Sequence, residues 1–141
     1  MPVIPKPLLN CVFYLYSNRE DALSGENAGG TGFLVALPTD DGQGHHYGVT
    51  NYHFAVSGGH SCIRINTLDG PEIFEFDPAD WYFEPGEDDI AIIPLSLREA
   101  GQIYMFVGSQ LLMQPHHVAD EMIGPGDDVF MAGRFVDLDT S

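Results

Sequence analysis

The apolar residues of this chain come in short runs that glycine and proline interrupt. Val, Ile, Phe and Tyr are frequent in these runs, and 16 Gly and 10 Pro are spread over the 141 residues. β-Branched and aromatic residues favour strands, whereas Gly and Pro favour the turns between them. We count about seven or eight such runs at the spacing of a barrel or sandwich, so we expect an all-β fold.

The charge of the chain limits its partners. It has 21 acidic and 5 basic residues, which give a formal net charge of -16. A field of this sign repels phosphate backbones and anionic lipids, so we expect neither a nucleic-acid nor a membrane partner. An excess of carboxylates is typical of a solvated surface, and attraction of basic substrates or partners is the alternative interpretation.

Cys11 and Cys62 are the two cysteines, and each lies in an apolar run. They form no disulfide framework and lack metal-ligand spacing, so we expect buried free thiols. The sequence shows neither a signal-peptide pattern nor an apolar window of about 18 residues. We therefore expect a cytoplasmic protein.

Two histidine pairs invite comparison with metal sites. His45-His46 and His116-His117 are neighbours in sequence, and neither pair has the i, i+4 spacing that directs two imidazoles at one ion. We interpret them as solvated loop histidines and expect no metal. No phosphate-binding glycine loop occurs either, because the run from Gly29 to Gly32 leads into a strand and lacks a following Lys. We expect no cofactor.

Three short motifs contain residues suited to acid–base chemistry. Gly30-Thr31-Gly32-Phe33-Leu34-Val35 precedes Val49-Thr50-Asn51-Tyr52-His53, and Asp89-Ile90-Ala91-Ile92 follows later in the chain. A histidine that acts as a general base needs a second group to bind its other ring nitrogen, and a carboxylate does this best. His53 and Asp89 are therefore the candidate catalytic pair.

These motifs, in this order and at this approximate spacing, resemble those of trypsin-like serine peptidases. Residues 126–133, Gly-Asp-Asp-Val-Phe-Met-Ala-Gly, are similar to the strand that opens the second barrel of that family. The resemblance implies that His53 is the base and that Asp89 orients it. Phe54 stands where secreted animal members have a cysteine next to the histidine, so the chain resembles the disulfide-free, bacterial type.

The resemblance also implies the architecture. Residues 1–125 are expected to form the first barrel of a double-barrel fold, antiparallel and six- to seven-stranded, with a short helical turn at His53. Residues 126–141 would begin the inter-barrel strand. The second barrel, which in the family supplies the Gly-x-Ser-Gly nucleophile, the oxyanion hole and the specificity pocket, is expected to be absent.

The function implied is that of the N-terminal part of a serine endopeptidase. Its partners would be a peptide or protein substrate and a C-terminal barrel in cis, with the serine beyond Ser141. We expect the 141-residue chain alone to be inactive. Asp88 competes with Asp89 for the orienting role, and the family pattern favours Asp89. Ser57, before Gly58-Gly59, imitates a nucleophile motif but is interpreted as part of a helix stop.

Two other classes of function remain as alternatives. A non-catalytic binding module could keep the peptidase barrel as a scaffold, because a fold does not determine a function. A half-peptidase assembled from two chains is the third interpretation.

Overall fold

The structure is a computed structural model that describes residues 6–38, 44–67, 69–86, 88–97 and 106–130. Its strands are β1 (Val12–Tyr16), β2 (Gly30–Pro38), β3 (Gly44–Thr50), β4 (Cys62–Thr67), β5 (Gly70–Glu75), β6 (Ala91–Leu95) and β7 (Val107–Gly108). Its helices are short: η1 (Lys6–Cys11), α1 (Arg19–Ser24), η2 (His53–Ser57), η3 (Pro78–Asp80), η4 (Ser109–Leu111) and α2 (Pro115–Asp120). None of the described helices is long and apolar enough to span a lipid bilayer.

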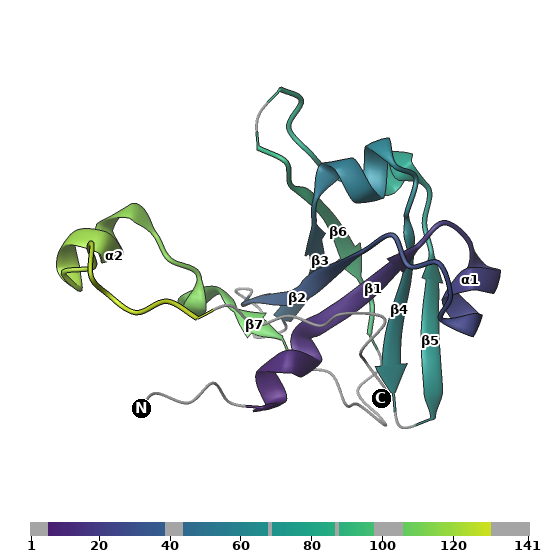
Figure 1. Ribbon diagram of the computed structural model, residues 1–141, viewed down its shortest axis with the longest axis horizontal. Coiled ribbons are helices and arrows are strands. Elements are labelled where there is room, and N and C mark those ends of the chain that lie inside the picture. Colours follow the sequence, from purple (N-terminus) through teal and green to yellow (C-terminus); the bar gives the residue numbers. More distant parts are fainter. Residues whose placement is uncertain (1–5, 39–43, 68, 87, 98–105, 131–141) are drawn as a thin grey trace.

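All seven strands belong to one curled sheet (Figure 1). Six of them follow the order β5-β4-β1-β2-β3-β6 with antiparallel neighbours, and β7 pairs in parallel with β2. Because β4 returns to lie beside β1, strands β1 to β4 form a Greek key. The sheet curls into a half-barrel whose two ends are β5 and β6. The all-β prediction is confirmed.

The concave side of the sheet carries the core. Alternate residues of each strand point inward, as the pleat requires, and the largest of them are fully buried: Phe13, Leu15, Leu34, Ile63 and Ile93. Trp81, which lies after η3, is also buried against this cluster. The predicted buried thiols are confirmed, since Cys11 and Cys62 are both free and buried. Burial raises the pKa of each thiol.

The segment between β1 and β2, residues 17–29, contains the helix α1, although its polar, glycine-containing sequence is typical of a loop. Asn18 caps α1 by accepting a hydrogen bond from the Asp21 backbone N–H at 2.8 Å, and Gly25 ends the helix in the left-handed conformation. The Arg64 guanidinium of β4 donates to the carbonyl oxygens of Ala22 and Leu23, which ties α1 to the sheet.

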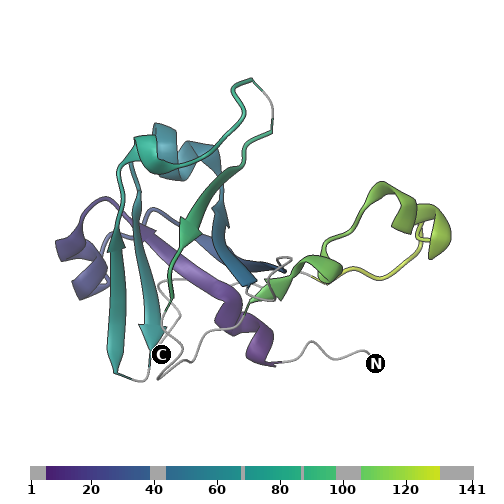
Figure 2. The same cartoon turned by 180° about the vertical axis from the view of Figure 1, so that it is seen from behind.

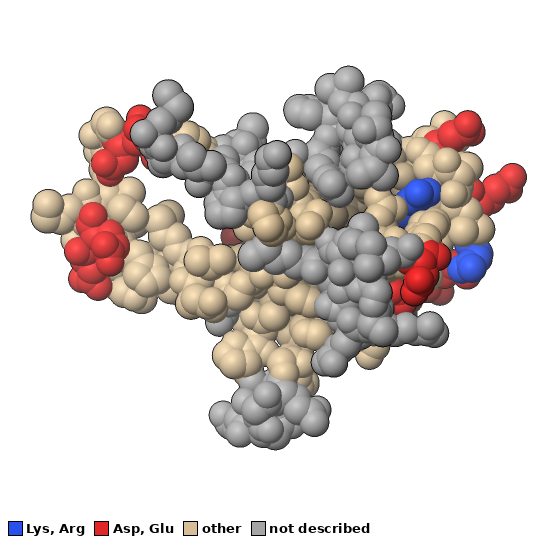
Figure 3. All heavy atoms as spheres, turned by 90° about the horizontal axis from the view of Figure 1, so that it is seen from below, with Lys and Arg blue, Asp and Glu red and all other residues tan. Residues whose placement is uncertain are grey.

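Residues 109–130 form an arm that extends away from the sheet in both views (Figures 1 and 2). Its side chains are almost all exposed, including those of the apolar residues Met122 and Val129. Carboxylates gather on this arm and on the opposite end, around α1 and β5 (Figure 3). The domain boundary predicted between residues 125 and 126 stays a prediction, and residues 131–141 lie outside the described part.

The expectation of solvated loop histidines is confirmed only in part: His45 and His116 are exposed, but neither pair lies in a loop. His45 and His46 lie in β3, where His46 stacks on Phe106 with ring centroids 4.1 Å apart. His116 and His117 lie in the first turn of α2, and the His117 ring accepts a hydrogen bond from the Gln114 backbone N–H at 2.8 Å. The stacking of His46 on Phe106 joins residues that are far apart in the sequence, so their spacing does not reveal it. The cap at His117 is local.

Candidate active site

The candidate histidine lies where β3 passes into η2. The Thr50 hydroxyl donates to the Thr31 carbonyl oxygen at 2.8 Å, so the end of β3 is held against β2. The Asn51 carbonyl then accepts from the backbone N–H groups of Phe54 and Ala55. The chain therefore leaves the sheet and enters a single wide helical turn that starts at His53. The helical turn predicted at this point is confirmed.

Two glycines at the start of β2, Gly29 just before it and Gly30 as its first residue, lie against the segment that contains η2. A methyl group on Gly30 would lie 2.8 Å from the Phe54 ring, and one on Gly29 would lie 2.0 Å from the His60 ring. Both distances are shorter than van der Waals contact, so the two aromatic rings pack directly on the glycine backbone. From sequence, this glycine run reads as a turn before a strand. In the structure these glycines also contact Phe54 and His60, so they support the segment that carries His53.

Ser61 ties the same turn to the interior. Its buried hydroxyl donates to the Ala55 carbonyl oxygen at 2.7 Å and accepts from the Trp81 indole N–H at 3.2 Å. One hydroxyl thus satisfies a carbonyl of η2 and the indole beside η3. Buried polar groups with both partners satisfied make a local structure rigid and unique.

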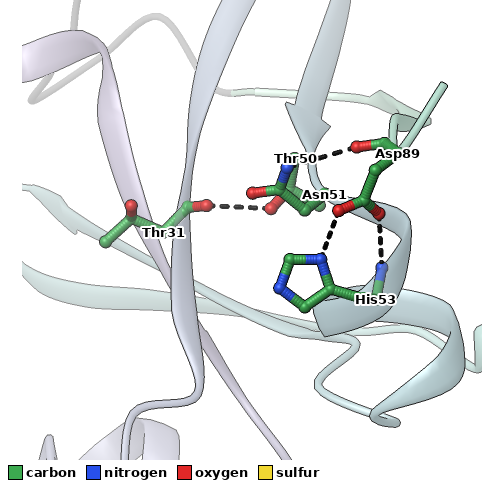
Figure 4. Close-up of polar contacts among 5 residues, drawn as sticks. All are labelled: Thr31, Thr50, Asn51, His53 and Asp89. Carbon is green, nitrogen blue, oxygen red and sulfur yellow. Dashed lines mark hydrogen bonds and ion pairs between the residues drawn. The ribbon is translucent and has the colours of Figure 1, made fainter.

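His53 and Asp89 are side by side, as predicted. The His53 Nδ1 and Asp89 Oδ2 share a hydrogen bond, and the His53 backbone N–H donates to Asp89 Oδ1 at 2.9 Å (Figure 4). One carboxylate therefore binds both the ring and the main chain of the same histidine. The two side chains are 56% and 48% exposed. In Figure 4 the second ring nitrogen, Nε2, points away from Asp89.

The hydrogen bonds also determine the charge of the site. The His53 backbone N–H lowers the pKa of Asp89 most, and the hydrogen bond from the His53 side chain lowers it further. Asp89 is therefore ionised at neutral pH and acts as an acceptor only. A neutral His53 then keeps its proton on Nδ1, which leaves the Nε2 lone pair free to accept a proton.

Asn51 is a site residue that the motif analysis did not assign. Its side-chain Nδ2 donates to the Asp89 carbonyl oxygen at 3.2 Å (Figure 4). This bond links the end of β3 to the segment that leads into β6. The two residues are 38 positions apart in sequence. The only signal in the sequence is the polar residue between Thr50 and Tyr52.

Replacing Asn51 with alanine should loosen Asp89 without unfolding the protein. The lost bond is an exposed one, so we expect the free energy of unfolding to fall by no more than about 1 kcal/mol. The His53 Nδ1–H proton should exchange faster with water, as measured by ¹⁵N-edited NMR. Asn51→Leu, which keeps the approximate size and removes the donor without adding a charge, should behave in the same way. An unchanged exchange rate in both variants would contradict a positioning role.

The other candidates do not join the pair. Asp88 is exposed, and of the two neighbouring carboxylates only Asp89 contacts His53. Within the described residues, no serine hydroxyl is hydrogen-bonded to His53, and this includes the exposed Ser57. The same residues contain no group of three or more side chains that could hold a metal ion.

Comparisons with family models, with curated proteins and with solved structures find no match to this chain. The features of this chain that bear on function are its motifs and the geometry of the His53–Asp89 pair.

Proposed function

We propose that this chain supplies the base and the orienting carboxylate of a trypsin-like serine endopeptidase. The observation that carries the proposal is the pair of hydrogen bonds from His53 to Asp89, together with the lack of any hydrogen bond to Nε2 from the residues that the structure describes. The motif order in the sequence and the Greek-key half-barrel agree with it. A histidine held by a carboxylate in this way is the base of hydroxyl-activating hydrolases.

The proposed chemistry is acyl transfer to a serine. His53 Nε2 takes the proton of the serine hydroxyl as the oxygen attacks the peptide carbonyl, and it later donates that proton to the leaving amine. Asp89 stays ionised, keeps the imidazole in the productive tautomer and stabilises the imidazolium. Water then takes the place of the amine. His53 Nε2 removes a proton from this water as it attacks the acyl-enzyme, and then returns the proton to the serine oxygen.

The serine belongs to a part of the protein outside the described residues. The exposure of the His53 side chain, 56%, suits this arrangement. The oxyanion hole would come from the same part of the protein.

The scaffold interpretation is favoured by the lack of any described serine hydroxyl at His53. In that case the barrel would bind a partner without chemistry, and the His53–Asp89 bond would serve only to join η2 to the start of β6.

Serine-directed labelling tests the proposal. The protein carrying this chain, produced at the full length that its gene encodes, is treated with a fluorophosphonate probe and analysed by peptide mass spectrometry. We expect one labelled serine beyond Ser141 and loss of labelling in the His53→Ala variant. Asp69→Asn, an exposed change in the β4–β5 turn, is the control and should label normally. Absence of labelling and of peptide hydrolysis would favour the scaffold, and labelling at Ser57 would place the nucleophile inside η2.

A further inference from the structure

A pocket lies on the outer side of β6, next to the candidate pair. Its volume is about 380 Å³, and it is lined by Tyr82, Phe83, Glu84, Asp88, Ile90 and Ile92. The Tyr82 backbone pairs with Ile92, so two extended segments form the floor. Four of the lining residues are large apolar side chains that are 37–69% exposed. This is a contiguous apolar surface that the described residues leave uncovered.

Two carboxylates complete the lining. Glu84 and Asp88 are exposed, and neither is paired with Lys, Arg or His among the described residues. Asp89, the next residue after Asp88, differs because its carboxylate is hydrogen-bonded to His53. The pocket thus combines an aromatic and aliphatic floor with two free negative charges at its rim.

This combination matches one class of side chain. Lys and Arg have an apolar stem that packs on hydrocarbon surface and a cationic end that binds carboxylates. An aromatic ring such as that of Tyr82 attracts the same cation through its π face. A neutral apolar side chain would leave both carboxylates unused, and an anionic one would be repelled by them.

The pocket shares its wall with the candidate site. Phe83 packs on Tyr52 with ring centroids 4.7 Å apart, and Tyr52 directly precedes His53. On the other side, Asp88 directly precedes Asp89. A polypeptide seated in the pocket would therefore pass close to the imidazole.

We propose that this pocket binds the Lys or Arg side chain of a polypeptide ligand. If the chain is part of a peptidase, as proposed above, that ligand is the substrate, and the enzyme prefers substrates with a basic residue near the cleaved bond. The net charge of -16 would speed the approach of such ligands.

Peptide binding to the 141-residue chain tests the pocket without requiring hydrolysis. The probes are the capped peptide Gly-Ala-Arg-Ala-Gly and the same peptide with citrulline, the neutral isostere of arginine, at about 150 mM salt to screen long-range attraction. NMR titration should show shifts at Tyr82, Ile90 and Ile92 with the arginine peptide. The citrulline peptide should bind about tenfold more weakly, because it lacks the charge-assisted hydrogen bonds.

Matched variants separate the pocket from general charge attraction. Glu84→Gln combined with Asp88→Asn should weaken arginine-peptide binding about tenfold. Glu20→Gln combined with Glu26→Gln removes the same charge from exposed sites on and after α1 and should leave binding unchanged. All four side chains are exposed, so both variants should keep the wild-type NMR dispersion.

The outcomes are distinct for the two proposals. Equal binding of both peptides, or equal weakening by the two double variants, would overturn the pocket assignment. Specific arginine binding by a protein that fails the labelling test would support the pocket and refute the peptidase. Hydrolysis that does not distinguish arginine from citrulline would support the peptidase and refute the pocket.

Discussion

If the full-length protein has the proposed peptidase activity, replacing Asp89 with asparagine is expected to abolish nearly all of its turnover while the protein still folds. The asparagine amide donates where the carboxylate accepted, so the proton of His53 moves from Nδ1 to Nε2 and the base can no longer accept a proton. In serine peptidases of the trypsin type this change reduces turnover on the order of 10⁴-fold. We expect a loss of that size in kcat at neutral pH.

The chain itself reports the same change through the tautomer of His53. ¹⁵N NMR of the imidazole at neutral to mildly alkaline pH should show the proton on Nδ1 in the wild type and on Nε2 in Asp89→Asn. Asp69→Asn makes the same chemical change in an exposed turn and should alter neither kcat nor the tautomer. A wild-type tautomer in Asp89→Asn would contradict the orienting role of Asp89.

The acid limit follows from the direction of the Asp89 pKa. The bonds from His53 lower the pKa of Asp89 in the folded state, so its carboxylate stabilises the fold at pH values above the ordinary carboxyl pKa. That contribution is lost as the pH falls through the lowered, folded-state pKa. The His53–Asp89 bond should therefore persist below the pH at which an ordinary aspartate is protonated. The Asp89→Asn variant should lack the loss of stability that accompanies protonation of Asp89.

Replacing Gly32 with alanine is expected to destabilise the whole barrel. A methyl group at this position would lie 2.3 Å from the Phe13 ring and 2.6 Å from the Val49 carbonyl oxygen. Phe13 is fully buried, and Val49 is held by the pairing of β2 with β3, so neither neighbour has room to move. Overpacking of this kind costs on the order of 1–3 kcal/mol, and the free energy of unfolding measured with urea should fall by at least that amount.

Gly44→Ala is the matched control for this effect. Gly44 also lies in a strand of the sheet, but a methyl group there would have its nearest neighbour at 3.7 Å, an ordinary contact. We expect its free energy of unfolding to stay within about 1 kcal/mol of the wild-type value. Equal losses in the two variants would show that the effect comes from strand propensity and not from the contact with Phe13.

The sequence is sufficient to predict most strands. In a half-buried strand, apolar residues that face the core alternate with polar residues that face solvent. The run around Ile63 was recognisable for this reason, whereas the runs around Leu34 and Ile93 were recognisable as short, continuous apolar segments. The start of β1 and the presence of α1 were not. Cys11 belongs to a helical turn although it adjoins the apolar run that becomes β1, and α1 depends on the Asn18 cap and on Arg64, which is 42 residues away from Ala22.

By itself, the sequence determined the all-β class, the buried thiols and the choice of His53 and Asp89, since composition, alternation and short motifs are local properties. Only the tertiary structure decided that these two side chains meet, that Asn51 holds the Asp89 carbonyl, and that Gly29 and Gly30 seat η2. It also decided that Glu84 and Asp88 border an apolar pocket. The physical reason is that hydrogen bonds and van der Waals contacts act over a few ångströms in space, whereas the partners in the first three contacts are separated by many residues along the chain. Glu84 and Asp88 are close in sequence, but the apolar floor between them forms only because Tyr82 pairs with Ile92.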